Sequence, residues 1–272
     1  MQLTMHGVRA AKTPFAQIFL RRRLVLRIVR SDLRVRYAGA VLGTWWLLLY
    51  PIFMLAAYAS VYLFVFRVRP TGMTTEAYVL YLFSGLVPFL ASAEAITLSA
   101  NSVTASRALF ANTVFPVELA PVKAVFATQP AQAVALLLCL LGTCLLGSVT
   151  PNLLLLPLVW VLHIAFLIGL AWLLALVTLV FRDLQAMLPI VVMLLYIVSP
   201  IAYTPDMVPA RLQPLLWLNP LAPFILCYQQ ILALGVAPSA GQLLLCALLA
   251  AAFFFGGSSV FARAKSIAVD YA

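Results

Sequence analysis

Charged residues are scarce in this sequence. They make up 9% of the 272 residues, only 7 of these are acidic, and 65% of the chain is apolar. No water-soluble domain of this length can bury so much hydrocarbon, so the composition excludes a soluble protein and indicates an all-α polytopic membrane protein. The loops between the apolar runs are too short to hold a separate soluble domain, and residues 1–272 are therefore expected to form a single transmembrane domain.

Motifs for nucleotide binding and hydrolysis are also missing. The sequence contains no G-x-x-x-x-G-K-[ST], no H-E-x-x-H and no G-x-S-x-G, and its acidic residues are scattered. These absences argue against an enzyme. No cofactor is expected in this chain, and any nucleotide must be hydrolysed by another polypeptide.

Cysteine and histidine are few and have no ligand spacing. The four cysteines, Cys139, Cys144, Cys227 and Cys246, lie in or beside apolar segments and form no C-x-x-C pair. They predict neither a metal site nor a disulfide framework and are interpreted as packing residues. His163 stands alone in an apolar span and is interpreted as a hydrogen-bonded packing residue.

Long apolar runs define the topology. They predict six transmembrane helices at about 41–66, 78–100, 124–146, 153–180, 186–201 and 242–261. Six spans place both termini on one side, where 14 of the 17 Lys and Arg residues would lie, so both termini are expected in the cytoplasm. No cleavable signal peptide is expected, because the basic residues run directly into a long span.

Proline interrupts the apolar stretch at 202–240. One straight transmembrane helix is excluded there by Pro205, Pro209, Pro214, Pro220 and Pro223. Two short helices that enter the membrane and return fit this length, and such broken backbone is tolerated where protein or a water-filled cavity surrounds it.

Basic residues gather before the first span. Nine Lys and Arg face one acid, Asp32, before residue 37, and this excess is typical of a membrane-flanking region rather than of nucleic-acid binding. On a helix over 15–37, Arg23, Arg27, Arg30 and Arg34 share one stripe, which predicts an amphipathic helix at the membrane interface. The alternative is a soluble amphipathic helix with a solvated charged face.

Aromatic residues are dense in the first span, at Trp46, Tyr50, Phe53, Tyr58 and Tyr62. Aromatic faces pack against sugar rings, so a stripe facing a lumen could guide a polysaccharide. Interface anchoring and helix packing explain the same residues equally well.

Glu94 is the one acid inside a predicted span, which makes it a functional-site hypothesis. The alternative is a structural hydrogen bond to a partner helix or to the arginines before the first span.

The loop over 101–123 combines polar residues with two prolines, Pro116 and Pro121. It predicts a compact element that docks in a groove of a partner, with Phe110, Phe115 and Val117 as apolar anchors. The alternative is a simple connector.

Four segments in this order resemble one family: RSDLRVRYAGAVLGTWWLLLYPIFML, LFANTVFPVELAPVKAV, FRDLQAMLP and WLNPLAPFI. The chain resembles the ABC-2-type transporter permeases that export bacterial polysaccharides such as O-antigen, capsule and teichoic acid. The resemblance implies a homodimer in the bacterial cytoplasmic membrane. It also implies two copies of a separate ABC ATP-binding subunit that binds ATP and Mg, and a polyprenyl- or lipid-linked polysaccharide as substrate.

The resemblance also implies roles for individual residues. The entrance for the carrier lipid would lie at Arg27, Arg30, Arg34 and Arg36. The substrate channel would be lined by Trp46, Tyr50, Phe53, Tyr58, Tyr62 and Glu94. Contact with the ATPase would involve Arg107, Phe110, Asn112 and Phe115, and the outer gate would include Trp217, Asn219 and Pro220.

Three other functions compete with this interpretation. The same fold could export a drug, a lipid or a peptide. A membrane enzyme acting on polyprenyl-linked sugars would need acidic and basic residues grouped at one membrane face, and Asp183 beside Arg182 is too little. A proton-driven transporter would depend on Glu94 alone.

Overall fold

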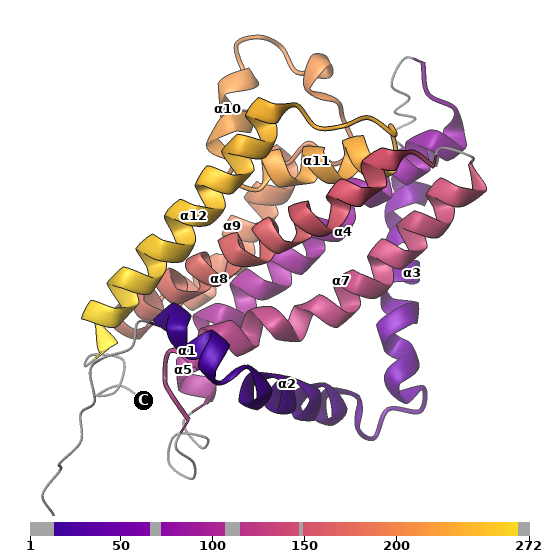
Figure 1. The fold of residues 1–272 in the computed structure, drawn as a ribbon. Coiled ribbons are helices and arrows are strands. Elements are labelled where there is room, and N and C mark those ends of the chain that lie inside the picture. Colours follow the sequence, from indigo (N-terminus) through magenta and orange to yellow (C-terminus); the bar gives the residue numbers. More distant parts are fainter. Residues whose placement is uncertain (1–13, 66–71, 107–114, 147–148, 266–272) are drawn as a thin grey trace, which may run out of the picture.

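The computed structural model describes residues 14–65, 72–106, 115–146 and 149–265, without the side chains at 36, 37, 215 and 217. Helices account for nearly all of these residues, and none of them lies in a strand (Figure 1). This confirms the predicted all-α class.

Long apolar helices form the body of the molecule. Five segments are long and apolar enough to cross a membrane: Gly43–Val65, Thr75–Ala100 (α4), Leu119–Leu145 (α7), Pro151–Val180 and Ala240–Arg263 (α12). The first comprises η1 (Gly43–Trp45), α3 (Trp46–Ser60) and η2 (Val61–Val65), and the fourth comprises η3 (Pro151–Leu155) and α8 (Leu156–Val180). The predicted polytopic membrane protein is confirmed.

The span predicted at 186–201 corresponds to a shorter helix, α9 (Leu184–Val198). Its 15 residues reach about 22 Å, less than the hydrocarbon thickness of about 30 Å. α9 runs back toward the end of the bundle that carries α10 and α11, and α12 then returns the chain to the end where α1 lies (Figure 1). The described N-terminal and C-terminal segments therefore lie at the same end.

Two short helices occupy the proline-rich stretch at 202–240. These are α10 (Gln213–Leu218) and α11 (Ala222–Leu232), preceded by a single turn, η4 (Pro205–Met207). α11 is buried along almost its whole length and packs against α4, α8 and α12. Neither helix is long enough to cross a membrane, and Figure 1 shows both at the end opposite α2.

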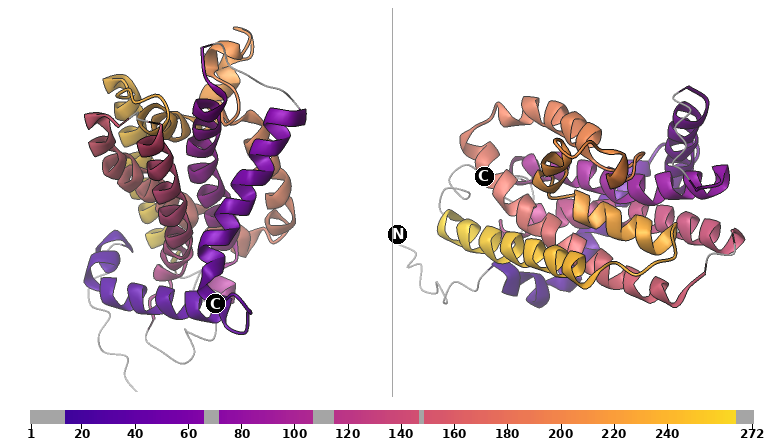
Figure 2. Two further views of the ribbon diagram at one scale, coloured as in Figure 1. Left: turned by 90° about the vertical axis from the view of Figure 1, so that its right-hand side faces the viewer. Right: turned by 90° about the horizontal axis from the view of Figure 1, so that it is seen from above.

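The basic N-terminal region forms α1 (Pro14–Leu20) and α2 (Arg22–Tyr37), where one helix over 15–37 was expected. α2 lies across the end of the bundle, whereas α3 runs along it (Figure 2). Its buried residues Val25 and Val29 face the bundle, where α2 packs against α7, while Arg27, Arg30 and Arg34 are exposed. This is the amphipathic arrangement that the arginine stripe predicts.

Burial is uneven among the long helices. In α4, 16 of 26 residues are buried, and it packs against α7, α8 and α11. In α3 only Pro51 and Leu55 are buried, and in α9 only Leu188. α4 is thus the axis of the fold, whereas α3 and α9 leave wide apolar faces uncovered.

Two glycines set the closest helix crossing. Gly169 of α8 and Gly257 of α12 face each other, and a Cβ added at either one would overlap the backbone of the opposite helix. α8 and α12 share the most extensive contact between any two described helices. Small residues at this crossing allow close van der Waals packing, which stabilises helix pairs where the hydrophobic effect between helices is weak.

We predict that Gly169→Ala and Gly257→Ala each destabilise the protein by about 1–3 kcal/mol, because the added methyl group forces the two backbones apart. Gly256→Ala is the matched control, since nothing lies within 4 Å of a Cβ at that position. Thermal unfolding of the detergent-solubilised protein measures the effect. Equal unfolding temperatures for Gly257→Ala and Gly256→Ala would contradict the glycine crossing.

Candidate functional site

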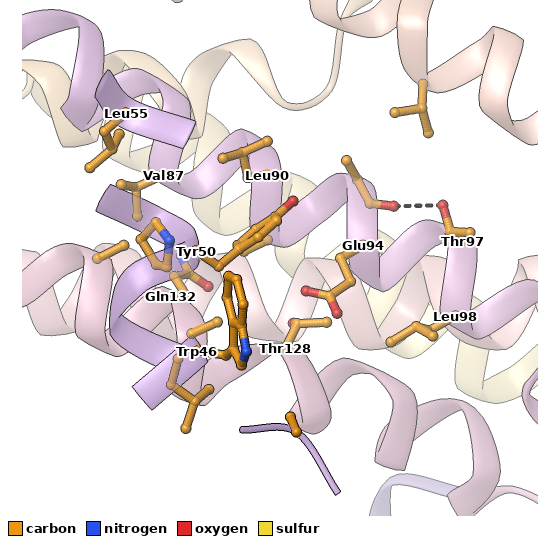
Figure 3. Close-up of a pocket in the computed structure, with 18 residues that line it drawn as sticks. Trp46, Tyr50, Leu55, Val87, Leu90, Glu94, Thr97, Leu98, Thr128 and Gln132 are labelled. Atoms are coloured by element: carbon orange, nitrogen blue, oxygen red, sulfur yellow. Dashed lines mark hydrogen bonds between the residues drawn. The ribbon is translucent and has the colours of Figure 1, made fainter. Parts of the chain in front are cut away.

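A cavity of about 710 Å³ lies between the loosely packed α3 and the walls formed by α4 and α7 (Figure 3). Val192 of α9 and Ala40, in the turn between α2 and η1, also line it. Because Ala40 belongs to this turn, the cavity extends to the end of the bundle where the arginines of α2 are exposed. It exists because α3 buries so few of its own side chains.

Three of the predicted channel residues line this cavity: Trp46, Tyr50 and Glu94. Figure 3 shows the two aromatic rings of α3 facing the α4 side that carries Glu94. The aromatic rings are partly exposed, and Glu94 is half-buried. The cavity therefore combines flat aromatic surface with one carboxylate, in an otherwise largely apolar lining.

The other aromatic residues of the first span lie elsewhere. Tyr62 Oη lies 3.3 Å from Tyr196 Oη of α9, within hydrogen-bonding distance, and the Tyr58 ring centroid lies 5.4 Å from that of Tyr196. Phe53 is exposed and is not among the cavity residues. Tyr58 of α3 and Tyr62 of η2 thus join the first span to α9 within this chain, and the channel role of all three residues stays a prediction.

Polar residues of the cavity wall include three that the sequence interpretation missed: Thr97, Thr128 and Gln132. Thr97 Oγ1 donates to the Ala93 carbonyl at 2.9 Å, and Thr128 Oγ1 donates to the Val125 carbonyl at 2.9 Å. The available signal was weak. Thr128 and Gln132 are four residues apart on an apolar helix and so share a face, but sequence alone does not say which face meets a cavity.

The arginines predicted at the carrier entrance lie on the outer face of α2. Arg27, Arg30 and Arg34 are exposed there, while the Arg36 side chain lies outside the described part. The turn from α2 into η1 contains Gly39 and Gly43, both with positive φ, a conformation that glycine adopts readily. This turn directs the chain from α2 across the bundle end into the span that forms one wall of the cavity.

At the opposite end, side chains fasten the non-helical segment 199–203. Asn219 Nδ2 donates to Ser199 Oγ at 2.8 Å, and Asn219 Oδ1 accepts from the Leu221 amide at 3.0 Å. Asn219 therefore links the end of α9 to the start of α11. Pro220 lies in the turn before α11, and the Trp217 side chain is outside the described part.

Gln229 of α11 holds the same segment from the other side. Its Nε2 donates to the carbonyls of Pro200 at 2.9 Å and Ile201 at 3.1 Å, and Tyr78 Oη of α4 donates to the Ala202 carbonyl at 2.9 Å. Gly85 of α4 makes this possible, because a Cβ there would overlap the Gln229 amide. Carbonyls that no helix can satisfy are thus bonded by side chains, as a low-dielectric interior requires.

The loop predicted to contact an ATPase is described only in part. Arg107, Phe110 and Asn112 lie outside the described residues, so their coupling role stays a prediction. Phe115 and Val117 are buried in this chain's own core, at 6% and 8% exposure. This burial differs from the exposed apolar anchors that the sequence predicts, and the contact of the loop with an ATP-binding subunit stays a prediction.

Of the remaining candidates, His163, Cys139, Cys227 and Cys246 are buried, whereas Cys144 is exposed. His163 Nε2 lies 2.9 Å from Ser92 Oγ, and its ring stacks on Phe224. The sulfurs of Cys227 and Cys246 lie 3.9 Å apart, within hydrogen-bonding distance for sulfur, and form no disulfide. In the described part of the chain, no group of three or more His, Cys, Asp or Glu could hold a metal ion.

Comparison with known proteins decides the family. The model of the ABC-2 type transporter family matches residues 23–233, most of the chain and all of the regions described above except α1 and α12. The chain belongs to this family. It is therefore a transport subunit of the ABC-2 type, and membership implies an ABC ATP-binding partner.

Three curated relatives of this chain are each named O-antigen export system permease protein RfbA. Two from Klebsiella pneumoniae are 27% and 28% identical over 216 and 222 residues, each match covering 78% of this chain and 81% of the relative. One from Myxococcus xanthus is 24% identical over 248 residues, covering 90% of this chain and 94% of the relative. The similarity thus extends over 78–90% of this chain and 81–94% of the relatives.

We predict that Gln229→Leu lowers stability by about 1–3 kcal/mol, because two buried carbonyls lose their donor. Gln230→Leu on the same helix is the control, since the buried Gln230 Oε1 has no hydrogen-bond partner among the described residues. Thermal unfolding of the two variants side by side measures the difference. Equal loss in both would show that the bonds to Pro200 and Ile201 contribute nothing specific.

Proposed function

We propose that this chain is the membrane-spanning subunit of an ATP-driven exporter that moves a lipid-linked polysaccharide across the bacterial cytoplasmic membrane. The observation that carries the proposal is the similarity to three O-antigen export permeases over more than three quarters of this chain. The cavity lined by Trp46, Tyr50 and Glu94 is structural support for the same proposal.

The chemistry of the cavity suits a sugar. Its volume of about 710 Å³ falls in the usual range for ligand sites. Trp46 and Tyr50 offer aromatic faces for the C–H face of a sugar ring, and Glu94, Thr97 and Thr128 supply oxygens for its hydroxyls. A few weak contacts of this kind guide a chain without holding it, which is what movement of a polymer requires.

The arginines of α2 suit the lipid carrier. Arg27, Arg30 and Arg34 are exposed at the end of the bundle to which the cavity extends. Guanidinium groups bind phosphate oxygens through paired hydrogen bonds, so this face is suited to lipid phosphates and to the pyrophosphate of a carrier. By the positive-inside rule this end, with both termini, faces the cytoplasm.

A second copy of this chain completes the pathway in our proposal. α3 and α9 adjoin through Tyr58, Tyr62 and Tyr196, and each has few buried residues. Such adjoining apolar faces fit a homodimer with a path between the two copies. Two ATP-binding subunits would bind ATP and Mg and contact the loop over 106–115.

The mechanism follows from these parts. ATP binding draws the two ATP-binding subunits together, and the loops over 106–115 are carried with them. The paired membrane subunits then open a central path toward the end that holds α10 and α11, and segment 199–203 marks its outer mouth. ATP hydrolysis gives the movement its direction, and the sugar chain slides along aromatic faces.

Deletion of the gene in its bacterial host tests the function. We expect surface polysaccharide to disappear and lipid-linked polysaccharide to accumulate on the cytoplasmic side, with both effects reversed by the wild-type gene. Immunoblotting of surface and membrane fractions measures both pools. Unchanged surface polysaccharide would overturn the proposal and favour a drug, lipid or peptide as the cargo.

The cavity makes a second prediction. Trp46→Ala together with Tyr50→Ala should slow polysaccharide export several-fold, because the sugar loses both aromatic faces on which it stacks. Phe53→Ala is the control from the same helix, since Phe53 is exposed and does not line the cavity. Export rates are compared at equal protein abundance. Equal rates in the wild type, the double variant and the Phe53→Ala variant would show that the cavity is not part of the export pathway.

The arginine face makes a third prediction. Replacing Arg27, Arg30 and Arg34 together by Glu should reduce export strongly, because carboxylates repel phosphate groups, while replacing all three by Lys should keep most of the activity. Topology is checked with reporter fusions at both ends. Wild-type export with correct topology in the Glu variant would contradict a role in carrier entry.

A further inference from the structure

Glu118 carries a buried carboxylate in the C-terminal part of the loop over 101–123, just before α7 begins. It is 1% exposed, and its Oε1 lies 3.0 Å from Nζ of Lys265, beyond the end of α12. Its backbone carbonyl accepts a hydrogen bond of 2.9 Å from Trp172 Nε1 of α8. One residue therefore binds the loop to two other helical segments, although it contributes nothing to the cavity.

These two segments behave as one block. Trp172 packs against Phe254 of α12 with ring centroids 5.4 Å apart, and the Gly169–Gly257 crossing brings the two backbones into contact. α8 and α12 cannot slide past each other without breaking this close packing. A force applied at Glu118 is consequently delivered to both helices together.

A buried ion pair is a specific contact rather than a source of net stability. An apolar pair of similar volume is often equally stable, whereas removing one partner leaves an uncompensated buried charge and is strongly destabilising. Glu118 Oε2 has no hydrogen-bond partner among the described residues, so Lys265 supplies the only described charge compensation. The pair fixes where the loop sits against the end of α12.

A second ion pair joins the first turns of α7 to α2. Lys123 Nζ lies 2.9 Å from Asp32 Oδ2 of α2, and the Asp32 side chain is 44% exposed. Exposed pairs are screened and contribute little. Each of the two pairs includes one half-exposed side chain, Asp32 at 44% and Lys265 at 46%, and the Glu118 pair differs in that its carboxylate is almost completely buried, at 2% exposure.

We propose that Glu118 is a positioning residue for energy coupling, which fastens the ATPase-contacting loop to the α8–α12 block through Lys265 and Trp172. Displacement of the loop then moves the block instead of bending the loop. This inference rests on the proposed function, because it assigns a route for the force that an ATP-binding partner supplies.

The test compares three variants in the complete complex with its ATP-binding partner, reconstituted in vesicles. Lys265→Met leaves a buried unpaired carboxylate. The double variant Glu118→Met with Lys265→Met removes both charges and keeps similar volume. Lys265→Arg keeps the pair. Asp183→Asn is a control, because it removes an acid from the turn between α8 and α9 that forms no described ion pair. Each sample is measured for ATP hydrolysed, polysaccharide exported and unfolding temperature.

We expect Lys265→Met to lower the unfolding temperature and the double variant to recover it. Both should still hydrolyse ATP but export at least about threefold less polysaccharide per ATP, since residues in contact couple by such factors or more. Lys265→Arg and Asp183→Asn should behave as wild type.

A purely structural role predicts a different pattern, in which the double variant recovers export per ATP together with its stability. That result would overturn the proposal, as would unchanged export per ATP in Lys265→Met. If the wild-type complex exports no polysaccharide at all, the proposed function fails instead. The inference about Glu118 is judged only when the wild-type complex exports polysaccharide, by comparing the export per ATP of each variant with that of the wild type.

Discussion

The cost of leaving a charge or an unpaired backbone group in hydrocarbon governs the whole molecule. It confines the basic residues of α2 to one end, where Arg27 and Arg30 reach water. It requires Glu118, the buried acid at that end, to pair with Lys265. At the other end it makes Gln229 and Tyr78 bond the carbonyls of segment 199–203. Specific polar contacts are therefore found at both ends of a bundle whose core is largely apolar.

The positions of the long helices could be predicted from the lengths of the apolar runs in the sequence, because hydrocarbon allows few alternatives to a continuous helix. The predicted 153–180 and 242–261 differ from Pro151–Val180 and Ala240–Arg263 by two residues or fewer at each end. The largest difference among the long spans is at α7, which begins at Leu119 instead of 124. Pro121 was interpreted as part of the loop, yet it occupies the first turn, where proline costs no hydrogen bond.

The site itself was only partly predictable. Trp46, Tyr50 and Glu94 line the cavity, as aromatic density and a lone acid suggested, but Tyr58 and Tyr62 turn toward Tyr196. Periodicity places residues on a common face of one helix, whereas the neighbour of that face depends on how the helices pack. The roles of Gln229 and Glu118 depend on contacts between segments that are distant in the sequence, and no local sequence pattern predicts such contacts.

Reconstitution with purified components tests the central claim most directly. Vesicles holding this chain and its ATP-binding partner, with the arginine-bearing end outward, receive lipid-linked polysaccharide in the outer leaflet, and an external glycosidase reports what remains accessible. The account predicts that ATP makes the polysaccharide resistant to the enzyme, and that a hydrolysis-deficient partner abolishes this protection. Polysaccharide that stays fully accessible with ATP, or becomes protected equally without it, would contradict an ATP-driven polysaccharide exporter.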